Sequence, residues 1–275
     1  TPDADRLVQH ATGVAQAAEL KLGADRLADT DCGRDGDALP LFPSPRPEFR
    51  GQLRTLRPHL HALLLSDSIS PRPLHKSLVL LECLKSLRDE SCYRHELLAL
   101  AKALVHSISN LHFGPEVGVA PAKADAPVIE PWLRGVRAMA ADLSVLQTRR
   151  DIPYDVHHSD ARQMSQVLEP GSVDAVITSP PYPNEKDYTR TTRLESVILG
   201  FITSKRELQG LKKRLVRSNT RSVYKADRDD QWISGHPKIQ AIADAIEKRR
   251  IELGKTSGFE RLYHRVAKLY FGGMA

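Results

Sequence analysis

One stretch of the sequence decides the expected fold: Val173-Asp174-Ala175-Val176-Ile177-Thr178-Ser179-Pro180-Pro181-Tyr182. Its first six residues are mostly apolar and β-branched, which is typical of a short strand buried on both faces of a parallel sheet. The expected strand follows a break at Gly171-Ser172 and ends at the two prolines. Ligands of open α/β sheets bind outside the carboxyl ends of the strands, so we expect residues 179–182 to lie where chemistry occurs.

The Ser179-Pro180-Pro181-Tyr182 turn has the groups needed to hold a planar ring that carries an amine. Two consecutive prolines keep the backbone extended and donate no hydrogen bonds. The carbonyl groups of Ser179 and Pro180 are therefore expected to accept hydrogen bonds from an incoming NH2 group. Tyr182 offers a flat aromatic face on which the ring can stack. The alternative is a rigid turn after a strand, with no role in binding.

The run Thr178-Ser179-Pro180-Pro181-Tyr182 resembles the catalytic motif of the amino-group DNA methyltransferases, which modify cytosine N4 or adenine N6. Upstream, residues 158–162 and 171–174 look like the part that precedes this motif in the same family, with Ser159 in place of the usual Gly. Downstream, residues 183–190 and 193–195 resemble one branch of the bacterial DNA modification methylases. The resemblance is specific in 155–200, softer from about 110 to the end, and absent before about residue 50.

The resemblance implies a fold, a cofactor and a set of site residues. The fold would be α/β, a Rossmann-like sheet of the S-adenosylmethionine-dependent methyltransferases with a largely helical additional region. Ser179, Pro180, Pro181 and Tyr182 would be catalytic, and S-adenosylmethionine would lie against Asp160, Ala161 and Ser179. The target base would be flipped from duplex DNA, or presented in a single strand, and stacked on Tyr182. The leading Ser favours cytosine N4 over adenine N6, in a site-specific enzyme of the restriction-modification kind.

One expected part of such an enzyme is not found in the sequence, namely the Gly-rich loop that lets the cofactor approach the backbone. The glycines of Cys32-Gly33-Arg34-Asp35-Gly36-Asp37 do not follow a buried strand. Either a partner subunit or a further chain segment carries this loop, or the protein has lost catalysis and acts as a DNA-binding or complex-forming subunit. A third possibility is an RNA base methyltransferase, because related Pro-Pro-Tyr loops can serve guanine N2.

Basic residues gather after the motif and indicate a DNA partner. The residues expected to contact DNA are Arg190, Arg193, Arg217, Asn219, Arg221 and Lys225. Acidic residues are interleaved with them, so a solvated helix face with no ligand is the alternative.

The rest of the chain is predicted to be mainly helical. A poorly defined N-terminal segment and a Pro-rich linker occupy residues 1–50, a helical region 51–150, and the catalytic region with its helical, basic end 151–275. Apolar periodicity predicts helices over 51–65, 73–88, 91–112 and 129–149, then over 191–203, 205–217, 236–253 and 257–271. Residues 154–158 are a second candidate strand, and the Gly272-Gly273 end is expected to be a turn.

Composition limits the class of protein. The 275 residues suffice for a large core, and 41% apolar with 27% charged residues excludes wholesale disorder. Three cysteines without metal-ligand or redox spacing indicate reduced thiols and a cytoplasmic protein, and no metal site is expected. No apolar run is long enough to span a membrane, and the N-terminus does not resemble a signal peptide. The net charge of +6 is compatible with a polyanionic partner.

Overall fold

The computed structural model describes residues 2–24, 52–114, 116–149, 152–183 and 187–275. Within these ranges the protein is mainly helical, and its one sheet contains two strands, β1 (Leu111–Phe113) and β2 (Val117–Val119). These strands pair antiparallel, with His112 opposite Gly118. The predicted α/β fold with a Rossmann-like sheet is therefore wrong for the described part of the chain.

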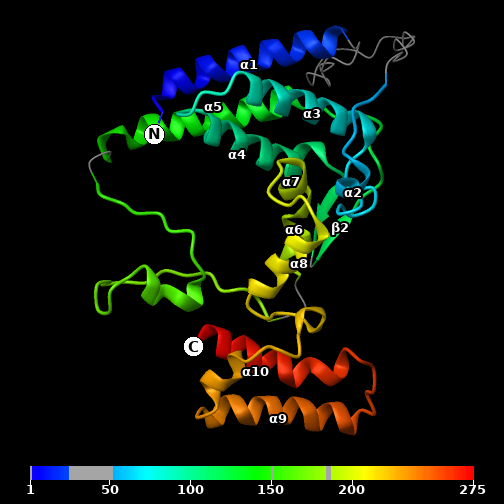
Figure 1. Cartoon of the computed structure of the whole chain (residues 1–275), viewed down its shortest axis with the longest axis vertical. Helices are drawn as coiled ribbons and strands as arrows, with labels where there is room; N and C mark the ends of the chain where they lie inside the picture. The colour runs from blue at the N-terminus through cyan, green and yellow to red at the C-terminus, as the bar shows by residue number, and fades with distance from the viewer. Residues whose placement is uncertain (1, 25–51, 115, 150–151, 184–186) are drawn as a thin grey trace, which may run out of the picture. The chain divides into compact units, whose positions relative to one another are not determined.

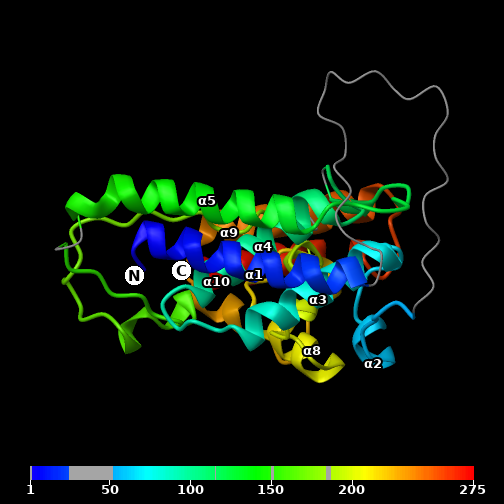
Figure 2. The same ribbon diagram turned by 90° about the horizontal axis from the view of Figure 1, so that it is seen from above.

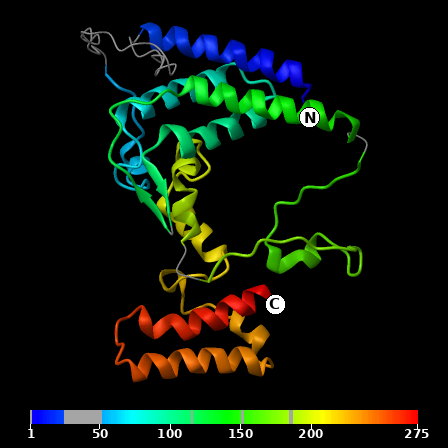
Figure 3. The ribbon, with the colours of Figure 1, turned by 180° about the vertical axis from the view of Figure 1, so that it is seen from behind.

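The stretch that decided the expected fold forms no strand. Residues 173–178 and 154–158 have no ladder partner among the described residues, and Figure 3 shows them as irregular chain on either side of one short helical segment. Ile177 is 100% exposed and Val176 is 73% exposed. A central strand must pair its N–H and C=O groups with neighbouring strands on both sides, and the described chain supplies none.

The chain divides into two compact units. Unit 1 contains Thr1–Ile152 and Thr192–Ser204, and unit 2 contains Pro153–Thr191 and Lys205–Ala275. The segment Thr192–Ser204 thus belongs to the first unit although it follows the Ser179–Tyr182 motif in the sequence. None of the described helices is long and apolar enough to cross a bilayer.

Unit 1 is built around four helices that lie side by side (Figures 1 and 2). They are α1 (Ala4–Ala24), α3 (Pro71–Ser86), α4 (Tyr93–Ala103) and α5 (Ile129–Val145). Shorter elements complete the unit: α2 (Pro58–His61), a π-helical turn (Leu104–Ile108), a 3-10 turn (Leu146–Arg149) and α7 (Arg193–Ile198). Pro58 and Pro71 begin their helices, as expected for a residue that has no N–H to leave unpaired.

The core of unit 1 centres on Trp132, which is fully buried on α5. Its indole N–H donates a 2.9 Å hydrogen bond to the backbone carbonyl of Glu96, so α5 is joined to α4 by a polar contact inside the apolar core. His10 of α1 places Nδ1 2.6 Å from the Glu96 carboxylate. Burial raises the pKa of Glu96, and this effect exceeds the opposite effect of His10.

Unit 2 combines irregular chain with short helices. Its elements are a 3-10 segment (Ala161–Gln166), α6 (Tyr188–Thr191), α8 (Lys205–Arg214), a 3-10 turn (Thr220–Ser222), η5 (Asp229–Ile233), α9 (Pro237–Glu252), a 3-10 turn (Glu260–Leu262) and α10 (Tyr263–Met274). α9 and α10 pack against each other, and α10 also packs on η5, where Ile233 and Leu269 are buried (Figure 3). The predicted turn at Gly272-Gly273 is wrong, because α10 continues to Met274.

Candidate functional site

A pocket of about 650 Å³ in unit 2 is the candidate site. Its wall is made of residues 158–161, residues 179–182 and Tyr188, together with Leu211 and Arg214 of α8 and the following Leu215 and Val216. The structure therefore places Asp160 and Ala161, expected to bind cofactor, around the same pocket as the motif Ser179–Tyr182. Residues 158–161 and 179–182 are separated in the sequence by a helical turn and a run of exposed chain. Their proximity therefore results from tertiary folding.

Most residues of the motif loop are exposed to solvent. Tyr182 is 66% exposed, and Ser179 and Pro180 are exposed as well. Because Pro180 and Pro181 have no N–H, the first donor after Ser179 is the N–H of Tyr182. This N–H donates a 2.8 Å hydrogen bond to the hydroxyl oxygen of Tyr188. The loop is thus tied down at its C-terminal end, and its four residues Ser179–Tyr182 line the pocket.

Tyr188 is held in turn by the residues around it. The Asp187 carboxylate accepts hydrogen bonds from the N–H and the hydroxyl of Thr189, at 3.0 and 2.6 Å, which starts α6. The other Asp187 oxygen lies 2.8 Å from the Lys212 ammonium group on α8. The sequence alone does not reveal a role for Tyr188, because its contact with the Tyr182 N–H depends on how the loop folds back.

Replacing Tyr188 with Phe should release the Tyr182 N–H without removing the ring. The lost hydrogen bond is worth about 1 kcal/mol, so the Tyr182 amide should exchange roughly fivefold faster with solvent deuterium. Amide exchange followed by NMR on the full chain measures this directly. Tyr270→Phe in α10 is the matched control and should leave Tyr182 unchanged. An unaltered Tyr182 exchange rate in Tyr188→Phe would contradict the anchoring role.

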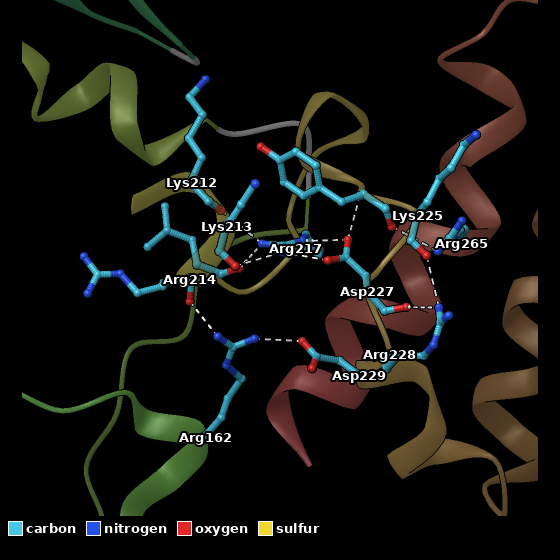
Figure 4. A network of polar contacts seen from close by, with 12 residues as sticks. Arg162, Lys212, Lys213, Arg214, Arg217, Lys225, Asp227, Arg228, Asp229 and Arg265 are labelled. Atoms are coloured by element: carbon cyan, nitrogen blue, oxygen red, sulfur yellow. Dashed lines mark hydrogen bonds and ion pairs between the residues drawn. The ribbon is translucent and has the colours of Figure 1, made fainter. Parts of the chain in front are cut away.

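Asp160 is engaged by its own neighbour, Arg162. The Asp160 carboxylate accepts hydrogen bonds from Arg162 Nε at 3.0 Å, from Nη2 at 2.7 Å and from the Arg162 N–H at 3.0 Å. Hydrogen bonding to Arg162 lowers the pKa of Asp160, although partial burial acts in the opposite direction. Arg162 also donates to Asp229 at 2.8 Å and to the Arg214 carbonyl at 2.6 Å (Figure 4). One guanidinium therefore connects the pocket wall to α8 and η5.

The residues that line the pocket lack the glycine backbone expected for S-adenosylmethionine. Both Asp160 oxygens already accept hydrogen bonds from Arg162, and none of the described residues that line the pocket is a glycine. A close approach of cofactor to backbone is therefore not provided by these residues. The glycine-containing segment 32–37 and residues 184–186 lie outside the described part of the chain. Within the described ranges, no group of three or more metal-ligating side chains is placed to hold a metal ion.

The residues expected to contact DNA are placed in two different ways. Arg221 and Lys225 are exposed, whereas Arg217 and Asn219 are only 4% and 3% exposed. Arg190 is half-buried in α6 of unit 2, and Arg193 belongs to α7 of unit 1. The structure thus offers Arg221 and Lys225 to a ligand, while the burial of Arg217 and Asn219 does not suit phosphate contact.

Arg217 has a structural position that explains its burial (Figure 4). Its guanidinium makes two hydrogen bonds to the Asp227 carboxylate, at 2.9 and 2.8 Å. It also donates to the carbonyl groups of Lys212 at 3.1 Å, Lys213 at 2.9 Å and Leu215. These carbonyl groups lie at the end of α8, where helical partners are lacking, so Arg217 caps the helix.

A second groove of about 580 Å³ lies along α9 and α10, lined by apolar groups of Ile242, Ile246, Leu253 and Tyr263. The cations at its rim are paired with carboxylates: Arg249 with Glu252, Arg250 with Glu247, and Lys255 with Glu260. It contains none of the motif residues. The groove is therefore a weaker candidate for chemistry than the pocket beside Tyr182.

Comparisons with known proteins do not extend these observations. No protein-family model, no curated protein and no solved structure matches the chain. The motif and the geometry of unit 2 are therefore the basis for assigning a function.

Proposed function

We propose that the protein is an S-adenosylmethionine-dependent DNA methyltransferase that modifies an exocyclic amine, with cytosine N4 favoured over adenine N6. The observation that supports this most is the pocket beside Ser179–Tyr182, in which an exposed tyrosine ring and donor-free proline backbone lie together. These are the groups that a planar, amine-bearing ring requires. S-adenosylmethionine, when bound, would supply the methyl group.

The roles of the residues follow from their chemistry. The Ser179 hydroxyl and the Pro180 carbonyl accept hydrogen bonds from the amine of the base and orient its nitrogen. Pro180 and Pro181 place no competing N–H at the amine. Tyr182 stacks on the base after it leaves the duplex, or as it lies in a single strand. Tyr188 fixes the backbone that carries Tyr182. Catalysis then depends on positioning, and no nucleophilic side chain is needed.

Incubation of the full chain with labelled S-adenosylmethionine and mixed-sequence DNA tests this function. Analysis of the digested nucleosides should reveal labelled N4-methylcytosine or N6-methyladenine. A parallel reaction with structured RNA separates the RNA alternative, because label in guanine and none in DNA would assign the activity to RNA. Absence of label from both nucleic acids at saturating cofactor would exclude catalysis by this chain alone.

Replacing Tyr182 with Ala should weaken binding of an unpaired base by about 1–3 kcal/mol, the usual contribution of base–aromatic stacking. Binding of a short fluorescent single strand, measured by anisotropy, gives this value independently of methyl transfer. Tyr182→Phe keeps the ring and is the matched control, which should retain most of the affinity. Equal affinities for the wild type and Tyr182→Ala would contradict the stacking role.

A second candidate function is that of a complex-forming subunit without catalysis of its own. Two observations favour it: the Asp160 carboxylate is fully engaged by Arg162, and the apolar residues Val176 and Ile177 are exposed. Calorimetric titration of the chain with S-adenosylmethionine separates the two candidates. Micromolar binding supports the enzyme, whereas no heat of binding supports the subunit.

We also propose a cytoplasmic location. Cys83 and Cys92 are free, buried thiols, a state that a reducing compartment maintains.

A further inference from the structure

We propose that the exposed basic edge formed by Lys213, Arg214 and Lys225 binds the phosphate backbone of the DNA strand whose base enters the pocket. The proposal rests on the proposed function, because it assigns a path to the same substrate. The proposal assigns phosphate contact to these exposed residues instead of to Arg217 and Asn219, which are buried.

The charges near the end of α8 fall into two groups. Lys212 is paired with Asp187 at 2.8 Å, and Arg217 is paired with Asp227 at 2.8 Å. By contrast, Lys213, Arg214 and Lys225 are exposed, and no carboxylate of the described residues forms an ion pair with them. Figure 4 shows Arg214 and Lys225 projecting on opposite sides of the Arg217–Asp227 pair, with Lys213 between them. The inner group holds the fold, and the outer group is available to a ligand.

Arg214 connects this edge to the pocket. It is one of the pocket residues, together with Tyr182 and Tyr188. The Asp160 carboxylate is hydrogen-bonded to Arg162 through both oxygens, and the nearby Arg214 charge also helps to lower the pKa of Asp160 without forming an ion pair with it. The Arg214 carbonyl is held by Arg162 at 2.6 Å, so the backbone from which the side chain projects has a defined position.

The other two cations, Lys213 and Lys225, lie near the aromatic ring of Tyr224 in space or in sequence. The Lys213 ammonium lies 5.9 Å from the centre of the Tyr224 ring, and the Arg217 guanidinium carbon lies 5.2 Å from the same centre. Lys225 follows Tyr224 directly in the chain. The Tyr224 N–H is bound to Asp227 at 2.7 Å, which fixes the segment. Exposed cations without an ion-pair partner among the described residues, one of them in the wall of a pocket that has an exposed aromatic ring, match a phosphodiester strand with one unstacked base.

The surface predicts a specific salt dependence. Each cation that neutralises a phosphate of a single strand contributes about 0.7 to the slope of log affinity against log salt concentration. The double variant Lys213→Ala/Arg214→Ala should therefore reduce the slope by about 1.4, which is twice 0.7, and weaken binding at low salt. Lys238→Ala/Lys248→Ala on α9 removes the same charge from exposed positions away from the pocket and is the matched control.

The experiment is a salt titration of binding to a short fluorescent single-stranded oligonucleotide, with the full chain and both double variants. A reduced slope in Lys213→Ala/Arg214→Ala alone supports the proposal. Equal slopes in the two double variants, or no binding by the wild type, overturn it. The readout is binding without methyl transfer, so a chain that binds through this edge yet transfers no methyl group contradicts only the proposed enzymatic function. Circular dichroism and amide exchange verify that each variant is folded.

Discussion

Replacing Arg217 with Met should lower the free energy of unfolding of unit 2 by about 3–5 kcal/mol, the usual cost of removing one partner of a buried ion pair. The Arg217 and Asp227 side chains are only 5% and 9% exposed, so the remaining carboxylate would be left with little solvent. The variant also removes the donors that cap the carbonyl groups of Lys212 and Lys213. Both losses act on the end of α8 and on the pocket wall that it forms.

Amide hydrogen exchange of the full chain, resolved by mass spectrometry, measures the effect within unit 2. The double variant Arg217→Met/Asp227→Leu is the control, because it removes the buried charge together with its partner. It should recover most of the loss, leaving only the missing helix cap. Similar losses in the single and double variants would mean that the ion pair is not the source of stability.

The same pair predicts how stability depends on pH. Burial alone would raise the pKa of Asp227, but hydrogen bonds from Arg217 and from the Tyr224 N–H lower it below its ordinary value. A lowered folded-state pKa stabilises the protein above the unfolded-state pKa of about 3.9, and this contribution is lost as pH falls through the folded-state value. Asp227→Asn should therefore lower the free energy of unfolding of unit 2 at neutral pH. It should also make that free energy fall less as the pH is lowered.

The helices could be predicted largely because their signals are local. The apolar periodicity of 73–88 and 129–149 corresponds closely to α3 (Pro71–Ser86) and to α5 with its 3-10 extension up to Arg149. The strand over 173–178 could not be decided in this way. Its composition is typical of a strand, but a strand also needs hydrogen-bonding partners far away in the sequence, and the described chain supplies none for these residues.

In the pocket, too, local features could be predicted from the sequence, whereas features that depend on distant contacts could not. Ser179–Tyr182 could be singled out from residue types alone, since donor-free backbone and an aromatic ring are local properties. Arg162 and Tyr188 could not, because their importance comes from contacts with Asp229 and Tyr182. The charge of Arg217 predicts a contact with DNA, whereas its side chain is buried against Asp227. A positive charge in a sequence does not reveal that a buried carboxylate ten residues later will bind it.

Replacing Gly272 with Ala should destabilise unit 2 by on the order of 3 kcal/mol, at the upper end of the usual cost of overpacking. A Cβ at this position would lie 1.9 Å from the carbonyl oxygen of Asp229 and 2.4 Å from its carbonyl carbon. These are backbone atoms, so no side-chain rotation relieves the clash, and α10 must move away from η5. Gly in a helix costs about 1 kcal/mol relative to Ala, yet only Gly permits this contact.

Gly210→Ala in α8 is the matched control for Gly272→Ala, because no atom lies within 4 Å of the added Cβ. It should stabilise the protein by about 0.5–1 kcal/mol. The effect of Gly272→Ala should also reach the pocket, since the Asp229 carboxylate binds Arg162, which in turn holds Asp160. Amide exchange should therefore increase in α10 and around Arg162 together. Increased exchange confined to α10 would show that Arg162 keeps the pocket wall in place without Asp229.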